Sequence, residues 1–230
     1  MLPALFTAGN IFCGFLSLDA SARGAYELAA ILVFVAAFLD GLDGRVARWT
    51  NTTSAFGEQL DSLADVVSFG VAPAFLVYHW GLAPFGRPGL LVSFLFAVCG
   101  ALRLARFNVQ IHVVDKRYFV GLPIPSAAGA LCGLVWSVPQ DLLTDALRGV
   151  FCAVTAALAF LMVSTLRYRS FKDADSKTRR GRFYFLLFAA IFAVIYWLRQ
   201  YALAGILVTY AASAPLARLF ALLRPKPASA

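Results

Sequence analysis

The stretch FLDGLDGRVARWTNTTSAFGEQLDSLAD, residues 38–65, decides the fold of this chain, because it sets acidic residues between two strongly apolar runs. The apolar runs cover residues 31–39 and 66–78, and the aspartates near them are Asp40, Asp43, Asp61 and Asp65. Ionisable groups beside or within a membrane are costly, so by default they mark a functional site. Carboxylates held close together also repel one another unless cations neutralise them. The stretch therefore predicts a divalent metal ion, held by oxygen ligands, at a membrane surface.

The spacing of these residues places them on two facing helices. One face of the first helix, at positions i, i+3, i+4 and i+7, carries Asp40, Asp43, Gly44 and Ala47. One face of the second helix, at intervals of four, carries Gly57, Asp61 and Asp65. The segment Trp49–Phe56 is short and polar, as expected for a turn between antiparallel helices. The small residues would leave space between the helices, and Arg48 would add a cation that binds phosphate through two hydrogen bonds.

The composition is that of an integral membrane protein. Of the 230 residues, 61% are hydrophobic and only 14% are charged, and the mean hydropathy is +0.77. Eight apolar spans approach the roughly 20 residues that cross a bilayer: 2–18, 25–44, 59–81, 88–106, 123–139, 144–166, 182–198 and 201–222. We therefore expect an all-α, polytopic membrane bundle of about eight transmembrane helices. Residues 1–223 would form a single domain with the motif helices at about 25–81, and residues 224–230 a disordered tail.

The distribution of basic residues predicts the orientation in the membrane. With the N-terminus inside and eight crossings, all but four of the 20 Lys and Arg residues fall on the cytoplasmic side; the exceptions are Arg23, Arg87, Arg148 and Arg199. The net charge of +8 is thus mostly a topology signal, with some attraction to anionic lipid, and does not indicate nucleic acid binding. The acidic motif would then open toward the cytoplasm.

Polar residues on other apolar spans are further candidates for a functional site. Thr7 and Asn10 lie one turn apart on the first span, where they could bind a ligand or form interhelical hydrogen bonds. Arg103 and Arg106 end the fourth span, with Asn108 close by. These arginines could bind an anion, extend to the membrane surface as anchors, or complement a helix C-terminus. The sixth span is followed by Tyr168 and Lys172. Their side chains could line the rim of a pocket at the same membrane face, or they could simply be exposed to solvent.

The acidic motif resembles the signature of the CDP-alcohol phosphotransferases, which reads D-x2-D-G-x2-A-R-x8-G-x3-D-x3-D. Every position matches, from Asp40 to Asp65. Five segments together resemble the phosphatidylserine synthase branch of that family: LPALFTAGNIFCGF at 2–15, DSLADVVSFGVAPA at 61–74, ALRLARFN at 101–108, GLPIPSAAG at 121–129 and LMVSTLRYRSFK at 161–172. The resemblance covers about residues 2–172. It implies an enzyme that displaces CMP from a CDP-linked lipid with an alcohol as nucleophile.

The resemblance implies a reaction and a set of roles. CDP-diacylglycerol and L-serine would give phosphatidylserine and CMP, with two divalent ions, Mg²⁺ or Mn²⁺, held by Asp40, Asp43, Asp61 and Asp65. Asp65 would also be the general base. The residues that would bind the nucleotide and the CDP-lipid are Thr7, Asn10, Gly44, Ala47, Arg48 and Gly57. Those that would bind serine or phosphate are Arg103, Arg106, Asn108, Tyr168 and Lys172. The resemblance also implies a bacterial inner-membrane setting and allows a homodimer.

Three alternatives remain open at this point. The acceptor could be another alcohol, such as glycerol 3-phosphate, or the donor could be an archaeal lipid, because the motif does not reveal either. A different class of protein, a cation-binding transporter, could use the same acids. A transporter would be expected to show two repeat halves with interrupted helices near the membrane midplane. The acids instead cluster at one edge, and no internal repeat is evident.

Overall fold

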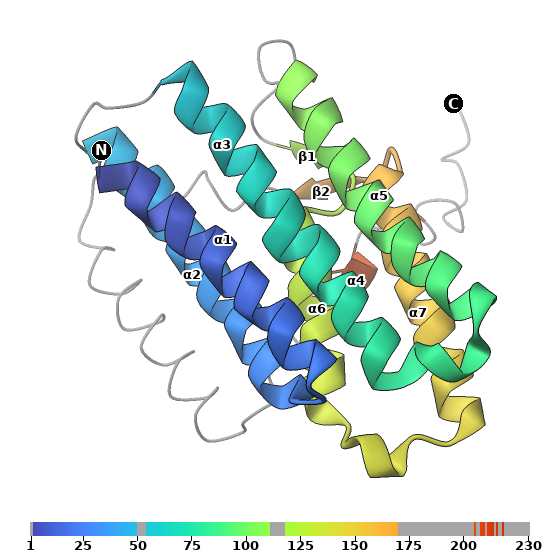
Figure 1. Cartoon of the computed structure of the whole chain (residues 1–230). Helices are drawn as coiled ribbons and strands as arrows, with labels where there is room; N and C mark the ends of the chain where they lie inside the picture. Colours follow the sequence, from blue (N-terminus) through green and yellow to red (C-terminus); the bar gives the residue numbers. More distant parts are fainter. Residues whose placement is uncertain are drawn as a thin grey trace, which may run out of the picture.

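The computed structural model describes residues 2–49, 54–110 and 118–169, together with positions 205, 208, 209, 211–213, 215 and 218. Helices dominate this part of the chain (Figure 1). The elements are α1 (Leu2–Ala22), α2 (Tyr26–Trp49), α3 (Ala55–Asp65), η1 (Val66–Val71), α4 (Ala72–Val77), η2 (Tyr78–Leu82), η3 (Ala83–Phe85), α5 (Arg87–Gln110), β1 (Tyr118–Val120), α6 (Ile124–Ser137), η4 (Gln140–Leu142), α7 (Asp145–Val163) and β2 (Arg167–Arg169).

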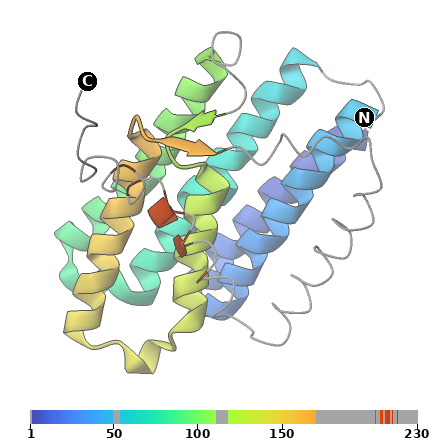
Figure 2. The same ribbon diagram turned by 180° about the vertical axis from the view of Figure 1, so that it is seen from behind.

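The first two helices form a tight antiparallel hairpin, visible from both sides in Figures 1 and 2. Gly24 ends α1 with a φ of 77°, a conformation that glycine adopts without steric cost. The backbone N–H of Ala25 donates to the carbonyl of Ala20 at 2.8 Å and so satisfies the end of the helix. The Ser17 hydroxyl donates to the Ala29 carbonyl at 2.9 Å across the hairpin. The hairpin returns the acidic end of α2 to the start of α1.

A second, continuous helical rod runs from Ala55 to Phe85 and contains two π-helical turns, η1 and η2. Ser54 caps its start by accepting a hydrogen bond from the Gly57 N–H at 3.1 Å. The π-helical turns η1 and η2 precede Pro73 and Pro84 respectively. Proline cannot donate its nitrogen to the helical ladder, so wide turns before it are a reasonable response of the backbone. The first wide turn begins directly after Asp65, and such turns often occur at functional sites.

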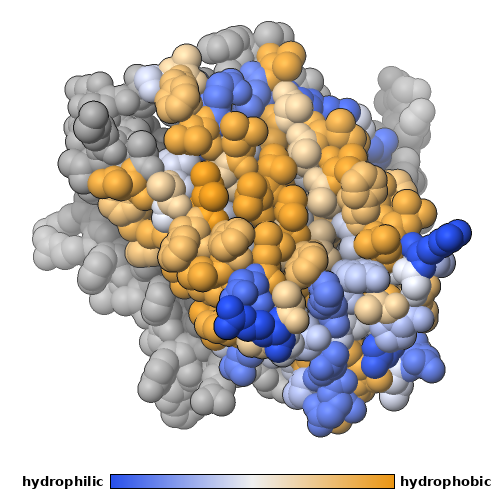
Figure 3. Space-filling model, in the orientation of Figure 1, coloured by the Kyte–Doolittle hydropathy of each residue, from blue (hydrophilic) through white to orange (hydrophobic). Residues whose placement is uncertain are grey.

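Four helical stretches in the described residues are long and apolar enough to cross a membrane: Leu5–Ala22, Ala55–Phe85, Arg87–Val109 and Asp145–Val163. The apolar α6 is shorter, and α2 ends in the charged motif. The surface in Figure 3 is largely hydrophobic along the helices. Among the described residues, large hydrophobic side chains such as Phe15 and Phe94 are exposed, at 62% each. Contiguous apolar surface of this kind suits contact with lipid.

These findings confirm a helical membrane protein but not the count of about eight spans. The first six predicted spans each coincide with helix. The predicted span 182–198 and the predicted tail 224–230 lie outside the described residues, and of the predicted span 201–222 only scattered helical positions are described. The structure therefore gives four candidate spans for the part of the chain that it describes.

A short antiparallel ribbon, β1 with β2, was not predicted by the all-α interpretation. Phe119 pairs with Tyr168, and Figure 1 shows the ribbon beside α5. Gly121, directly after β1, has a φ of 80°. A Cβ atom there would lie 2.3 Å from the Met162 carbonyl oxygen, so only glycine fits. The Gly121 N–H donates to the Leu166 carbonyl at 2.8 Å. This bond fastens the start of α6 to the end of α7.

Candidate metal centre

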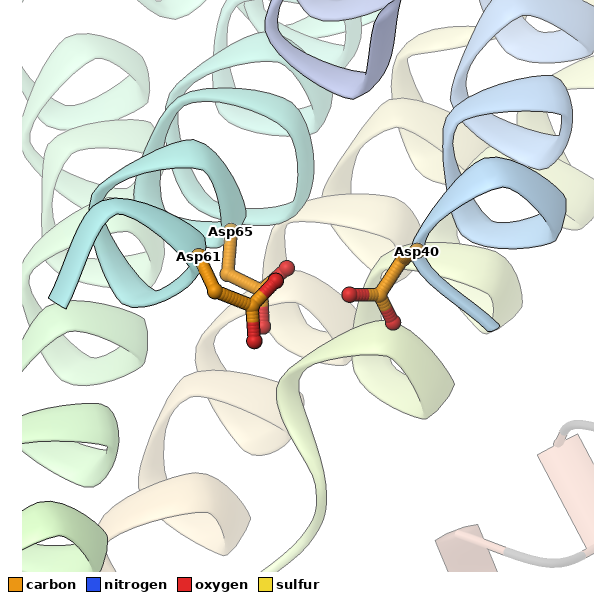
Figure 4. A group of neighbouring side chains, drawn as sticks. All are labelled: Asp40, Asp61 and Asp65. Atoms are coloured by element: carbon orange, nitrogen blue, oxygen red, sulfur yellow. The ribbon is translucent and has the colours of Figure 1, made fainter. Parts of the chain in front are cut away.

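Three of the predicted acids converge in space. One carboxylate oxygen from each of Asp40, Asp61 and Asp65 lies within 4.8 Å of the other two. Figure 4 shows Asp61 and Asp65 reaching from one helix toward Asp40 on the facing helix. Metal–oxygen distances of about 2.0–2.6 Å place two ligands of one divalent ion no more than about 5 Å apart. The spacing of the three oxygens therefore fits a shared divalent ion.

Buried polar atoms support the same conclusion. The Oδ1 atoms of Asp61 and Asp65 are buried and have no hydrogen-bond partner in the part of the chain that is described. A buried carboxylate oxygen that lacks a partner loses its hydration without compensation. Carboxylates at this distance also repel one another. A bound cation would remove both costs, so the residues present fit a divalent metal.

The fourth acid, Asp43, lies outside this group of three. It is 5% exposed and accepts a hydrogen bond from the Thr7 hydroxyl at 3.1 Å. Its role as a metal ligand, and with it the presence of a second ion, stays a prediction. The contact does establish that Thr7 on α1 faces the acidic end of α2. Thr7 therefore forms an interhelical hydrogen bond, and its contact with a ligand stays a prediction.

Asn10, one turn further along α1, is in a different situation. Its side chain is fully buried, and neither Oδ1 nor Nδ2 has a hydrogen-bond partner among the described residues. Its backbone carbonyl accepts a hydrogen bond from the Ser68 hydroxyl at 2.9 Å, which holds α1 against η1. A buried amide left without partners is costly unless a ligand or water satisfies it. Asn10 therefore keeps its candidacy as a binding residue.

The small residues and the cation of the motif are described only in part. Gly44, Ala47 and Arg48 lie in the last turns of α2, and their side-chain surroundings fall outside the described residues. Gly57 lies in the first turn of α3, where a Cβ atom would come 3.2 Å from the Ser54 hydroxyl. Its described contact is thus with the helix cap. That these residues leave space for the nucleotide stays a prediction.

The two arginines of α5 occupy different positions. Arg103 is 7% exposed and lies 5.2 Å from the centre of the Phe107 ring. This burial argues against a membrane anchor, which would extend to the surface. Arg106 donates from Nη1 to the Val163 carbonyl at 3.0 Å. Arg106 therefore complements the C-terminus of a neighbouring helix, α7. The sequence had suggested this role only for the C-terminus of α5, the helix that carries Arg106.

The remaining candidates at this face differ in how far the structure describes them. Asn108 donates from Nδ2 to the Ser62 hydroxyl at 2.9 Å. Tyr168 lies in β2, and its side chain is outside the described part, while Lys172 is wholly outside it. Ser62 itself was missed by sequence reasoning. Its position directly after Asp61 is the signal that could have found it.

Comparison with known proteins supports this interpretation of the acidic site. A family model described as CDP-alcohol phosphatidyltransferase matches residues 1–165. The chain is 45% identical over 174 residues to the CDP-diacylglycerol–serine O-phosphatidyltransferase of Helicobacter pylori, covering 75% of this chain and 73% of that protein. It is 34% identical over 182 residues to the Bacillus subtilis protein of the same name, covering 79% and 97%.

An archaeal relative extends the comparison. The archaetidylserine synthase of Methanothermobacter thermautotrophicus is 39% identical over 171 residues, which cover 74% of this chain and 67% of the relative. The family match includes all of α1 to α7, and therefore both helices that carry the converging aspartates. On these findings, this chain belongs to the CDP-alcohol phosphatidyltransferase family.

Proposed function

We propose that this chain transfers a phosphatidyl group from CDP-diacylglycerol to the hydroxyl of L-serine, which yields phosphatidylserine and CMP. The observation that carries the proposal is the convergence of Asp40 on α2 with Asp61 and Asp65 on the apolar rod Ala55–Phe85. The Helicobacter and Bacillus relatives are named for this activity. An integral membrane enzyme can take its lipid donor from the bilayer and its soluble acceptor from the adjoining water.

The three converging aspartates would hold the metal, with Asp43 as a further proposed ligand. Mg²⁺ and Mn²⁺ are the expected ions, because carboxylate oxygens suit both. When bound, a divalent ion supplies positive charge at the diphosphate of the donor and at the departing phosphate. The protein's own contribution is to hold oxygens from two different helices at the required distance.

Asp65 is the proposed general base. It is 9% exposed, and its two oxygens allow one to face the metal while the other accepts a proton. The serine hydroxyl gives its proton to this carboxylate as its oxygen bonds to the phosphorus that bears the diacylglycerol. The bond from that phosphorus to the CMP oxygen breaks, and CMP leaves with the electron pair. A positioned base contributes about 10²–10⁴ to the rate.

The donor and the acceptor would occupy different sides of the acids. Asn10, with its buried amide, and Thr7 are proposed to contact the CDP moiety together with Gly44, Ala47, Arg48 and Gly57. Arg103 and Arg106 are proposed to bind the serine carboxylate, with Tyr168 and Lys172 at the rim. Arg106 uses one N–H on Val163, and a guanidinium has five such donors. It can therefore hold α7 and still bind an anion.

The orientation and assembly belong to the same proposal. The basic asymmetry of the sequence supports an active site that faces the cytoplasm of a bacterial inner membrane. A cysteine placed at Lys116 should then react with an impermeant reagent in inside-out vesicles and not in intact cells. Labelling in intact cells would contradict this orientation. A homodimer is proposed from the family resemblance alone.

The decisive experiment measures CMP release from CDP-diacylglycerol by the purified enzyme, with Mg²⁺, with Mn²⁺ and with chelator. Serine should support release, and glycerol 3-phosphate should not, because its roughly two negative charges are repelled by the acidic motif. Faster release with glycerol 3-phosphate would overturn serine as the acceptor. The archaeal relative makes a second donor worth testing: an archaetidyl CDP-lipid should be compared at equal concentration. Family membership removes the case for a transporter.

A further inference from the structure

The acid-bearing end of α3 is lightly held. Among the described elements, α3 packs mainly against α1 and continues into η1. Of its residues, only Ala64 and Asp65 are buried, whereas Phe56 and Leu63 are exposed by 76% and 65%. Asp61 is half-buried and lies one turn before Asp65. The distance between Asp61 and Asp40 on the facing helix therefore depends on few contacts.

One polar contact ties this end of α3 to a well-packed helix. The Asn108 side chain on α5 donates from Nδ2 to the Ser62 hydroxyl at 2.9 Å. The same hydroxyl donates to the Glu58 carbonyl, one turn back on α3, at 3.1 Å. Ser62 thus uses both its acceptor and its donor function, so its rotation is fixed. Figure 1 shows α3 lying between α1 and α5, and this contact joins α3 to α5.

The contact lies directly beside the metal-binding acids. Ser62 follows Asp61, and successive helical residues point about 100° apart. A helix that is held at Ser62 by α5 therefore keeps Asp61 and Asp65 turned toward α2. If the contact is lost, α3 can shift or rotate, and Asp61 moves relative to Asp40. Metal sites lose affinity when the groups that orient their ligands are removed.

We propose that Asn108 is a positioning residue for the metal centre, acting through Ser62, and that it does not bind the serine substrate. This inference rests on the proposed metal-dependent function. It replaces the serine-binding or phosphate-binding role that the sequence had suggested for Asn108. It also gives Ser62, which the family signature leaves unspecified between Asp61 and Asp65, a defined role.

The test measures Mn²⁺ binding directly, by calorimetry or electron paramagnetic resonance, in the detergent-solubilised full chain without substrate. Asn108→Ala and Ser62→Ala should each weaken Mn²⁺ binding by about three- to tenfold, the scale of one neutral hydrogen bond. Ser62→Thr keeps the hydroxyl and should bind nearly as the parent does. The double variant Asn108→Ala/Ser62→Ala should bind no worse than either single variant, because both remove the same contact.

The matched control is Ser93→Ala, on the same helix as Asn108. Ser93 is buried and its hydroxyl donates to the Gly89 carbonyl of its own helix, so its loss should leave Mn²⁺ binding unchanged. Parallel CMP-release assays should show an unchanged serine KM in Asn108→Ala. A raised serine KM with unaltered Mn²⁺ binding would overturn the proposal and return Asn108 to the substrate site. Additive losses in the double variant would also overturn it. The proposed function fails separately from this inference. A parent enzyme that binds Mn²⁺ but does not use serine would contradict the proposed function and leave the role of Asn108 in metal binding intact.

Discussion

The helical rod from Ala55 to Phe85 has two unlike halves, and the candidate site lies where they meet. In α3 only the last two residues are buried. In α4 all but one of the residues are buried, and the wide turn η1 before it packs on α1. Asp65 stands at this boundary, at the last residue of α3 and directly before η1. One acid is thus held by the core, while Asp61 is held by a lightly packed helix end.

This difference indicates how the site can be firm and still admit substrates. The proposed general base, Asp65, needs a fixed position, because a small misplacement of a reacting group costs much of the rate. The proposed metal ligand Asp61 can tolerate some movement as donor and product exchange. Regions with few buried contacts open at low free-energy cost. We call η1 and α4, which are well packed, the firm half of the rod, and α3, which is lightly packed, the loose half. The comparison predicts that substitutions in the two halves will have different consequences.

The largest effect is expected from Asp65→Asn, at the boundary itself. An amide cannot take the proton of the serine hydroxyl, so kcat should fall by about 10²–10⁴. Asp40→Asn and Asp61→Asn should instead act chiefly through weaker binding of metal and CDP-lipid. Steady-state kinetics at several Mn²⁺ concentrations separates the two cases. Near-parental turnover of Asp65→Asn at saturating metal would show that another group is the base.

The next effect concerns the acceptor side, on α5. One charge-assisted hydrogen bond to a carboxylate contributes about 1.5–3 kcal/mol, so replacing the arginine that holds serine should raise the serine KM roughly 10–100-fold. Arg106→Ala and Arg103→Ala are both to be measured, with the KM for CDP-diacylglycerol as the internal reference. An unchanged serine KM in both variants would show that neither arginine holds serine. Their roles would then be structural: Arg106 through its bond to Val163, and Arg103 through its contact with Phe107.

A smaller effect, on stability, is expected where the firm half meets α1. A Cβ atom on Gly14 would lie 2.5 Å from the Ser68 hydroxyl oxygen and 3.0 Å from its Cα. Gly14→Ala should therefore separate α1 from η1 and destabilise the protein by about 1–3 kcal/mol. Gly149→Ala is the control, because no atom lies within 4 Å of its added Cβ. Thermal unfolding in detergent should show a lower Tm for Gly14→Ala only; equal Tm values would refute the close packing.

Much of this arrangement could be predicted from the sequence, because the informative patterns are local. Helical spacing predicted that Asp40 would face Asp61 and Asp65, and the structure brings these three together. The apolar runs predicted the helices that hold them. Local patterns could not place Asp43, whose partner Thr7 is 36 residues away. They also could not reveal that Arg106 reaches the end of α7 or that Asn108 reaches Ser62.

The β1–β2 ribbon was missed for a related reason. Its strands are only three residues long, and the residues that pair are far apart in the chain: Val120 pairs with Arg167 and Tyr118 with Arg169. So short a strand carries no detectable alternation of apolar and polar residues. Gly121 was the available signal, since an isolated glycine before a helix often marks a turn. Its positive φ became evident only in the structure.

The smallest effect is expected at the far end of the loose half, where Ser54 caps α3. Its side chain accepts the Gly57 N–H, and replacing such a cap by alanine costs about 0.5–2 kcal/mol. Because α3 buries little surface, this cost should stay local. Hydrogen exchange should quicken in the first turn of α3 in Ser54→Ala, while the Tm stays near the parental value. Bound Mn²⁺ should slow the exchange again, since it links Asp61 to Asp40 across the two helices. A fall in Tm as large as that of Gly14→Ala would mean that α3 unfolds together with the core, and the two halves of the rod would then be one cooperative unit.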